Sequence, residues 1–169
     1  MPGFVPKLRV PVRLCMAAQA PYDAFLSLFP LSEHHAGPET LLERLNTRTR
    51  VLPAVREDDH TVVLVTRDQV DWVEAGPDVE AQLIRPSAYL HTREEHVELR
   101  MVSGERVAGI LAMELPDAYN RASDFLNGDE DFFALSLSSG TRLVNKARVL
   151  DVRILSAGRV EWVGDSAAA

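Results

Sequence analysis

Two adjacent histidines, His34 and His35, are the first residues along the chain whose type suggests a chemical role. Imidazole is a common metal ligand and changes its charge near neutral pH, and Glu33 and Glu39 add carboxylates on either side. A metal site would still need ligands that converge from elsewhere, because the side chains of adjacent loop residues usually point apart. We therefore expect a surface loop here, with no metal ion and no other cofactor.

Two acidic clusters, Glu57–Asp59 and Asp129–Asp131, could supply paired carboxylates for acid–base catalysis. A catalytic pair needs a cleft and shifted pKa values, whereas both clusters fall in connections between expected strands. The sequence contains no nucleophile elbow, no glycine-rich phosphate loop and no dinucleotide fingerprint. We expect a protein that is not an enzyme.

Cys15 is the only cysteine, which excludes an intrachain disulfide and a cysteine-based zinc site. It lies between Leu14 and Met16 in an apolar run. This setting favours a small buried hydrophobic residue over a reactive thiol.

Two similar ten-residue stretches, Leu64–Val73 and Leu143–Val152, contain the polar residues that we consider the best candidates for binding. Each stretch carries a cation at the same position, and an asparagine also recurs after an expected helix in each half. An asparagine there also has a purely structural explanation, since it ends helices readily. The predicted binding residues are Asn46, Arg67, Asn127, Asn145 and Lys146.

The similarity extends over most of the chain and indicates an internal duplication. Val12–Met16 matches Val97–Met101, and Leu52–Val55 matches Phe132–Leu135. The matching blocks keep the same order in both halves. We therefore predict a first repeat at residues 8–75, a linker or edge strand at 76–95, and a second repeat at 96–163 with an extra C-terminal strand. Two copies are too few for a solenoid, so we expect a tandem or pseudo-twofold pair.

The hydrophobic pattern of each repeat predicts two strands, a short helix and three further strands. Apolar residues alternate at Val97, Leu99 and Met101, which is typical of a strand with one buried face. Five short strands favour a small barrel or a strongly bent sheet, because closure removes exposed edges. The expected fold is mainly β with short inserted helices. A unit of about 60 residues is marginal alone, so the two units should bury apolar surface against each other.

The composition is that of a globular protein, with 169 residues, 46% of them apolar and 25% charged. The formal net charge of −7 disfavours a general nucleic-acid binder. No stretch reaches the roughly 18–20 apolar residues that span a bilayer, and Arg9 and Arg13 interrupt the apolar run of an N-terminal signal peptide. We expect a cytoplasmic protein with no membrane association.

The second repeat resembles the Sm-like family of small five-stranded β-barrels through its strand, glycine turn and strand at Val97–Leu115 and through Asp124–Asn127. In that family, the corresponding asparagine and a later basic residue contact RNA, and the resemblance assigns these roles to Asn127 and Lys146. The helix of this chain is inserted among the strands, whereas the Sm helix precedes them. The chain also resembles short β-rich bacterial proteins of uncharacterised function, and that resemblance implies no activity.

These observations favour a non-catalytic binding or scaffold module. Its partner would be another protein or a second copy of the chain, bound at sheet edges or in a groove that the repeats share. The first alternative is an Sm-like RNA-binding protein, which the net charge disfavours. The second is a β-barrel of the PilZ type that senses a small nucleotide.

Overall fold

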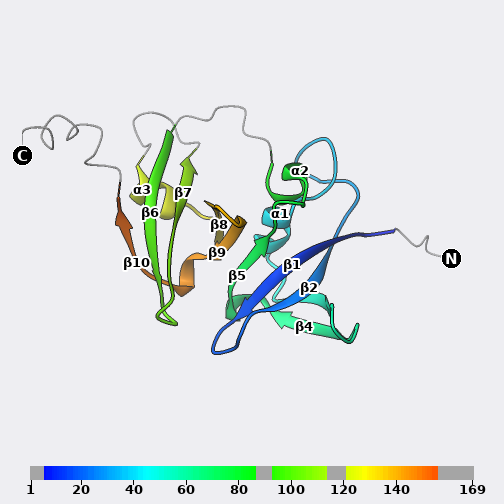
Figure 1. Cartoon of the computed structure of the whole chain (residues 1–169). Coiled ribbons are helices and arrows are strands. Elements are labelled where there is room, and N and C mark those ends of the chain that lie inside the picture. Colours follow the sequence, from blue (N-terminus) through cyan, green and yellow to red (C-terminus); the bar gives the residue numbers. More distant parts are fainter. Residues whose placement is uncertain (1–5, 87–92, 114–120, 156–169) are drawn as a thin grey trace, which may run out of the picture.

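The computed structural model describes residues 6–86, 93–113 and 121–155, which form a mainly β protein with a few short helices, as predicted (Figure 1). The first half contains β1 (Leu8–Met16), β2 (Tyr22–Leu28), α1 (Leu41–Leu45), β3 (Val51–Arg56), β4 (Val62–Thr66), the 3₁₀ turn η1 (Arg67–Gln69) and β5 (Val70–Ala75). After α2 (Ala81–Ile84), the second half contains β6 (Arg93–Met101), β7 (Arg106–Met113), α3 (Ala122–Leu126), β8 (Phe132–Leu137), β9 (Gly140–Asn145), the 3₁₀ turn η3 (Lys146–Arg148) and β10 (Val149–Ile154).

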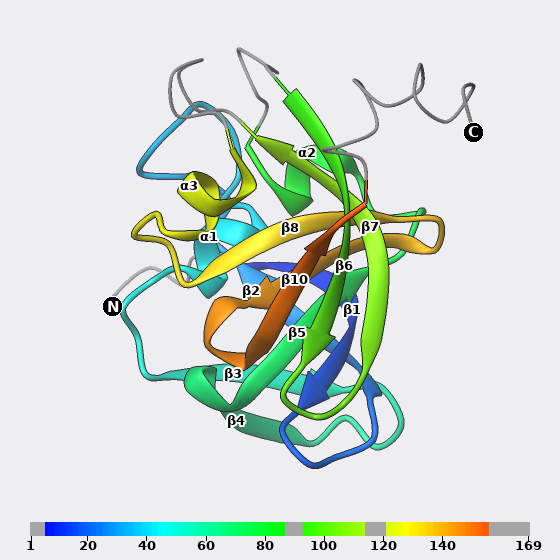
Figure 2. The same ribbon diagram turned by 90° about the vertical axis from the view of Figure 1, so that its left-hand side faces the viewer.

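All ten strands belong to one antiparallel sheet with the order β10-β6-β7-β8-β9-β5-β1-β2-β3-β4. The order is the same in the two halves, because the fifth strand of each lies beside its first, followed by the second, third and fourth. The sheet is not closed among the described residues, so the prediction of small closed barrels is not confirmed. Figure 2 shows the strong bend of the strands and places α1 and α3 on the same side of them.

The two halves are joined by unlike strands, since β5, the fifth strand of the first half, pairs with β9, the fourth strand of the second. A twofold relation would pair like strands with like. The expectation of a pseudo-twofold pair is therefore wrong, and the halves follow each other head to tail in the sheet.

Three further expectations need correction or lie outside the described residues. The alternative of an edge strand in the segment 76–95, through residues 79–84, is wrong, because these residues contain the helix α2. The first strand of the second half begins at Arg93, three residues before the predicted boundary. The extra C-terminal strand was predicted beyond residue 155 and lies outside the described part of the chain.

The predicted match between Leu52–Val55 and Phe132–Leu135 is shifted by one residue. Val51 pairs with Thr66 in the first half, as Phe132 pairs with Asn145 in the second. Val51 therefore occupies the position of Phe132. Four consecutive residues from Phe132 onward are buried, on both faces of β8, so the alternation that would have revealed the register is missing.

Helix α1 is short, and a complete capping box fixes its start. The Thr40 hydroxyl accepts a hydrogen bond from the backbone N–H of Glu43 at 3.2 Å, and the Glu43 carboxylate accepts one from the N–H of Thr40 at 2.9 Å. Leu41 and Leu45 lie one turn apart and are both buried. The cap and this pair anchor the helix on the sheet and so position the residues that follow it.

Each half completes its hydrophobic core with side chains from the other half. Phe132, Ala134 and Leu143 of the second half pack into the core of the first. In return, Cys15 and Trp72 of the first half pack into the core of the second. This exchange agrees with the expectation that a unit of about 60 residues needs additional burial.

The shared core predicts that a cavity made in one half destabilises the other. Phe132→Ala removes a side chain that is 0% exposed and should lower the free energy of unfolding by about 3–5 kcal/mol. Phe29→Ala is the matched control, because Phe29 is 40% exposed and its loss should cost less than about 1 kcal/mol. Urea denaturation followed by circular dichroism should give one transition for both variants. Separate transitions for the two halves in Phe132→Ala would contradict the shared core.

Candidate functional site

The junction between the halves is built on four residue pairs of β5 and β9, from Trp72 opposite Val144 to Ala75 opposite Thr141. Gly140 begins β9 with φ +143°, in a region that favours glycine. A Cβ atom at this position would lie 2.1 Å from the carbonyl oxygen of Ala75. Only glycine therefore allows the two strands to approach each other here.

Arg142 holds one face of the junction together. Its guanidinium lies over the Trp72 ring, 3.8 Å from the ring centroid, and bonds the carboxylates of Glu74 at 3.1 Å and Glu105 at 3.3 Å. The Trp72 indole also donates a hydrogen bond to Glu105 at 2.8 Å. Guanidinium groups favour this combination of stacking and carboxylate contacts. These contacts therefore link β5 and β9 to the β6–β7 hairpin.

An ion pair with a buried carboxylate and the predicted binding residue Asn145 hold the other end of the junction. Asp71 is 2% exposed and accepts a hydrogen bond from the Arg148 guanidinium at 2.8 Å. The Asn145 amide donates to the carbonyl of Val70 at 2.9 Å and accepts from the N–H of Ala147 at 3.1 Å. Asn145 is 3% exposed, so its side chain bonds groups inside the protein and does not face solvent.

Two more predicted binding residues, Asn46 and Arg67, also connect the halves. The Asn46 side chain accepts a hydrogen bond from the N–H of Phe132 at 2.8 Å and donates one to its carbonyl at 3.2 Å. Arg67 forms an ion pair with Asp131 at 2.6 Å and donates to the carbonyl of Thr49 at 3.1 Å. These contacts fix the end of α1 against the start of β8.

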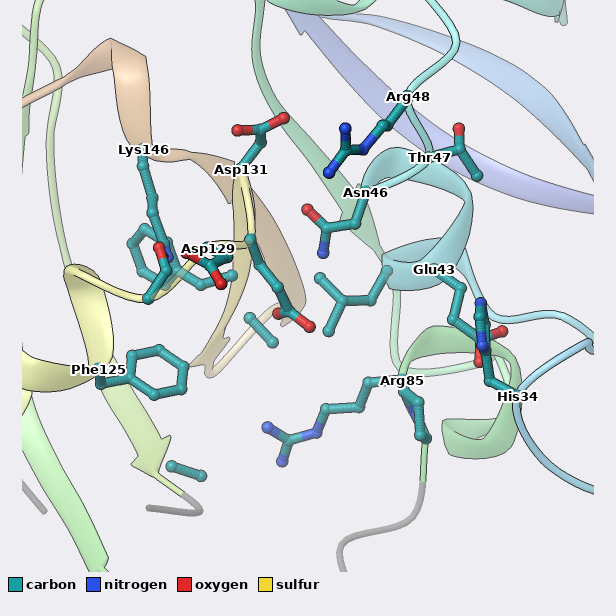
Figure 3. Close-up of a pocket in the computed structure, with 17 residues that line it drawn as sticks. His34, Glu43, Asn46, Thr47, Arg48, Arg85, Phe125, Asp129, Asp131 and Lys146 are labelled. Atoms are coloured by element: carbon teal, nitrogen blue, oxygen red, sulfur yellow. The ribbon is translucent and has the colours of Figure 1, made fainter. Parts of the chain in front are cut away.

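A groove of about 770 Å³ lies between α1 and α3, beside these contacts (Figure 3). Both halves line it, and Asn46 and Lys146 are the predicted residues among its walls. Its apolar lining includes Leu42, Phe125 and Phe133. Figure 3 shows the Phe125 ring and the Arg85 side chain extending toward the space between the two walls.

The charges of the groove are divided between its walls. Arg48 comes from the first half and Arg85 from the segment after α2 that joins the halves, and neither guanidinium has an ion pair among the described residues. The second half supplies Asp129, Glu130 and Asp131. Two arginines thus line one wall and three carboxylates the other, while Glu43 adds a carboxylate to the first wall and Lys146 an ammonium to the second.

Lys146 and Asn127 differ in their relation to this groove. The Lys146 ammonium donates to the carbonyl of Gly128 at 3.2 Å. Burial lowers the pKa of this ammonium, against the opposing effect of the three carboxylates of Glu130, Asp131 and Asp129. Asn127 ends α3 through its backbone N–H and is not among the residues that line the groove.

Sequence reasoning missed Arg48, Arg85 and Phe125. The two arginines follow helices in irregular segments, where hydrophobic periodicity carries no information about spatial neighbours. Phe125 falls in a short segment whose sequence predicts only an apolar helix residue. Its pairing with the aromatic ring of Phe133, at 6.4 Å between centroids and 90°, depends on the tertiary fold.

His34 is exposed and lines the groove, His35 is half-buried, and the first acidic cluster lies in an exposed connection. His35 Nε2 lies 2.6 Å from Glu43 Oε1, beside the start of α1. The hydrogen bond from Arg56 lowers the pKa of Asp58 to about 2, in the connection between β3 and β4. No group of three or more side chains with metal-binding chemistry occurs in residues 6–86, 93–113 and 121–155.

Comparison with models of protein families, with curated proteins and with solved structures found no match to this chain. The resemblance to Sm-like barrels therefore remains a prediction. No helix among the described residues is long and apolar enough to cross a membrane.

The Asn46 contact predicts unequal effects of the same substitution at two corresponding helix ends. In Asn46→Asp the carboxylate cannot donate to the Phe132 carbonyl, which should cost about 1–3 kcal/mol of stability. Asn127→Asp places the same charge at the end of α3, where the Asn127 side chain forms no hydrogen bond among the described residues of the chain, and in the single chain it should change stability by about 0.5 kcal/mol or less. Thermal denaturation measures both values. Equal losses would show that the contact between the halves is not important.

Cys15 should react slowly, since burial and the nearby carboxylates of Asp71 and Glu105 raise the pKa of its thiol to about 11. The thiolate reacts, so at pH 8 modification by a disulfide reagent should be about 100-fold slower than for an unperturbed thiol. The same chain in urea provides the control and should react at the ordinary rate. Equal rates in the two conditions would refute the buried setting.

Proposed function

We propose that the protein is a non-catalytic binding module whose groove between α1 and α3 holds an extended segment of a partner protein. The observation that carries this proposal is the position of two arginines without an ion pair among the described residues, across a partly apolar groove from three carboxylates. Arg48 and Arg85 lie on one side, and Phe125 extends toward them from the side that carries the carboxylates. The cytoplasmic location expected from the sequence is part of the same proposal.

The charges indicate what kind of occupant would fit. An acidic side chain would pair with the guanidinium of Arg85, and a basic side chain with the carboxylate of Asp129. An apolar side chain between them would contact Phe125, which supplies a large apolar surface. A polypeptide offers these three groups at close spacing, and complementary charges on both walls would fix its direction.

The acidic wall disfavours RNA as the occupant. Phosphates would lie beside Asp129–Asp131, while the nearest ammonium, Lys146, already donates to a backbone carbonyl. The net charge of −7 adds long-range repulsion. The same argument applies to a small nucleotide, so RNA binding and nucleotide binding remain the weaker alternatives.

We also propose that the two halves arose by duplication of one five-stranded unit. In support, both halves have the same strand order, a helix between the second and third strands, and a 3₁₀ turn before the fifth. A single unit would have only one of the two walls. The groove would thus have become available when two units were joined.

A random peptide library tests the proposed function on the intact protein. Selected peptides should contain an acidic and a basic residue separated by an apolar one. Arg85→Glu should weaken their binding at least about tenfold through charge repulsion. Arg9→Glu is the control, because Arg9 is exposed on β1 and is not among the residues that line the groove.

Peptides that bind both variants equally, or a library that gives no enrichment, would contradict the proposed function. A single-stranded RNA oligonucleotide serves as the second probe. Binding of this probe that weakens steeply with salt would instead favour the RNA alternative.

A further inference from the structure

Two strands, β4 and β10, lie at the edges of the described sheet and have one neighbouring strand each. Natural proteins protect such edges with charges, prolines or bulges. β4 has none of these, since its sequence is Val-Val-Leu-Val-Thr. Val62 and Leu64 on this strand are 66% and 69% exposed. An apolar strand of this kind is suited to pairing with another strand.

The internal junction shows what these exposed residues would contact. By strand register, Leu64 corresponds to Leu143 and Val51 to Phe132. Phe132 and Leu143 are 0% exposed, because they enter the core of the neighbouring half. Val51 and Leu64 are 42% and 69% exposed. The first half thus presents to solvent the apolar positions that the second half buries at the junction.

At the opposite edge of the sheet, apolar residues of β10 are likewise more exposed than the corresponding residues of β5 at the junction. Val73 and Ala75 on β5 are both 0% exposed beside β9. The corresponding residues of β10 are Val152, which is half-buried, and Ile154, which is 38% exposed. These apolar side chains would regain the missing burial if a strand equivalent to β9 paired with β10.

We propose that the chain self-assembles head to tail, with β4 of one copy paired antiparallel to β10 of the next. The register of the internal junction places Leu64 opposite Val152 and Val62 opposite Ile154. Val51 and Leu64 then enter the core of the second half of the neighbouring copy. This contact continues the sheet and repeats the β5–β9 junction between molecules.

Asn127 has a defined role in this assembly. Asn46 bonds both backbone groups of Phe132 across the internal junction. Asn127 ends α3 as Asn46 ends α1, and Val51 occupies the position of Phe132. In the assembly, the Asn127 amide therefore bonds the backbone of Val51 in the next copy.

The interface joins unlike edges, so each copy keeps one β4 and one β10 available after the first contact. Such a contact does not stop at a dimer; it continues until the sheet closes into a ring or grows as a filament. The wild-type protein should consequently have a mass of more than two chains.

Light scattering after size-exclusion chromatography measures this mass on the full chain. Leu64→Lys and Ile154→Lys each place a charge on one apolar edge, and each should reduce the mass to that of a single chain. Leu31→Lys is the matched control, since Leu31 is 75% exposed in the loop between β2 and α1 and belongs to neither edge strand, and it should assemble like wild type. Circular dichroism should be the same for all variants, because the altered side chains are exposed.

Mixing the two edge variants gives the sharpest test. Leu64→Lys retains β10 and Ile154→Lys retains β4, so an equal mixture has one intact interface and should form a two-chain species that grows no further. A wild-type protein with the mass of one chain would overturn the proposal. Edge variants that assemble like wild type, or a mixture that stays monomeric, would overturn it equally.

Discussion

The antiparallel pairing of β5 with β9 is the constraint on which the rest of the structure depends. It makes two five-stranded units into one sheet and lets each contribute apolar side chains to the core of the other. Gly140 permits the close approach, and the buried Asp71 carboxylate pairs with the half-buried Arg148 guanidinium across the junction. A shifted register would leave this carboxylate buried without its partner, which disfavours such a shift.

The groove is a consequence of the same pairing. Helices α1 and α3 lie in different halves, and they flank a common space because the sheet is continuous between them. Asn46 and Arg67 then set the position of α1 against β8 through contacts with Phe132 and Asp131. Arg48 comes from the first half, Arg85 from the segment that joins the halves, and the three carboxylates of Asp129–Asp131 from the second half. Any binding role of the groove therefore depends on the integrity of the junction.

Much of the local structure could be predicted from the sequence. The alternation of apolar and polar residues predicted the strands. The short apolar segments after the second and seventh strands predicted the helices. The buried setting of Cys15 was also predicted correctly. Local patterns succeed here because period-two and helical spacings reflect burial on one face.

The contacts between the halves could not be predicted in this way. Asn46, Arg67 and Asn145 were recognised by their matching positions and were assigned to binding, yet each bonds a residue of the other half. Nothing in their neighbourhood in the sequence reveals such distant partners. β8 is buried on both faces and lacks alternation, which explains the one-residue error at Phe132.

Native-state hydrogen exchange of the β5 and β9 backbone amides tests the central claim most directly. If the junction is an integral part of the fold, the amides of Trp72–Ala75 and Thr141–Val144 that bond across it exchange only through global unfolding, as slowly as the central amides of β1 and β6. Exchange at these junction amides that is much faster than within either half would show that the halves separate while still folded, and would contradict the account.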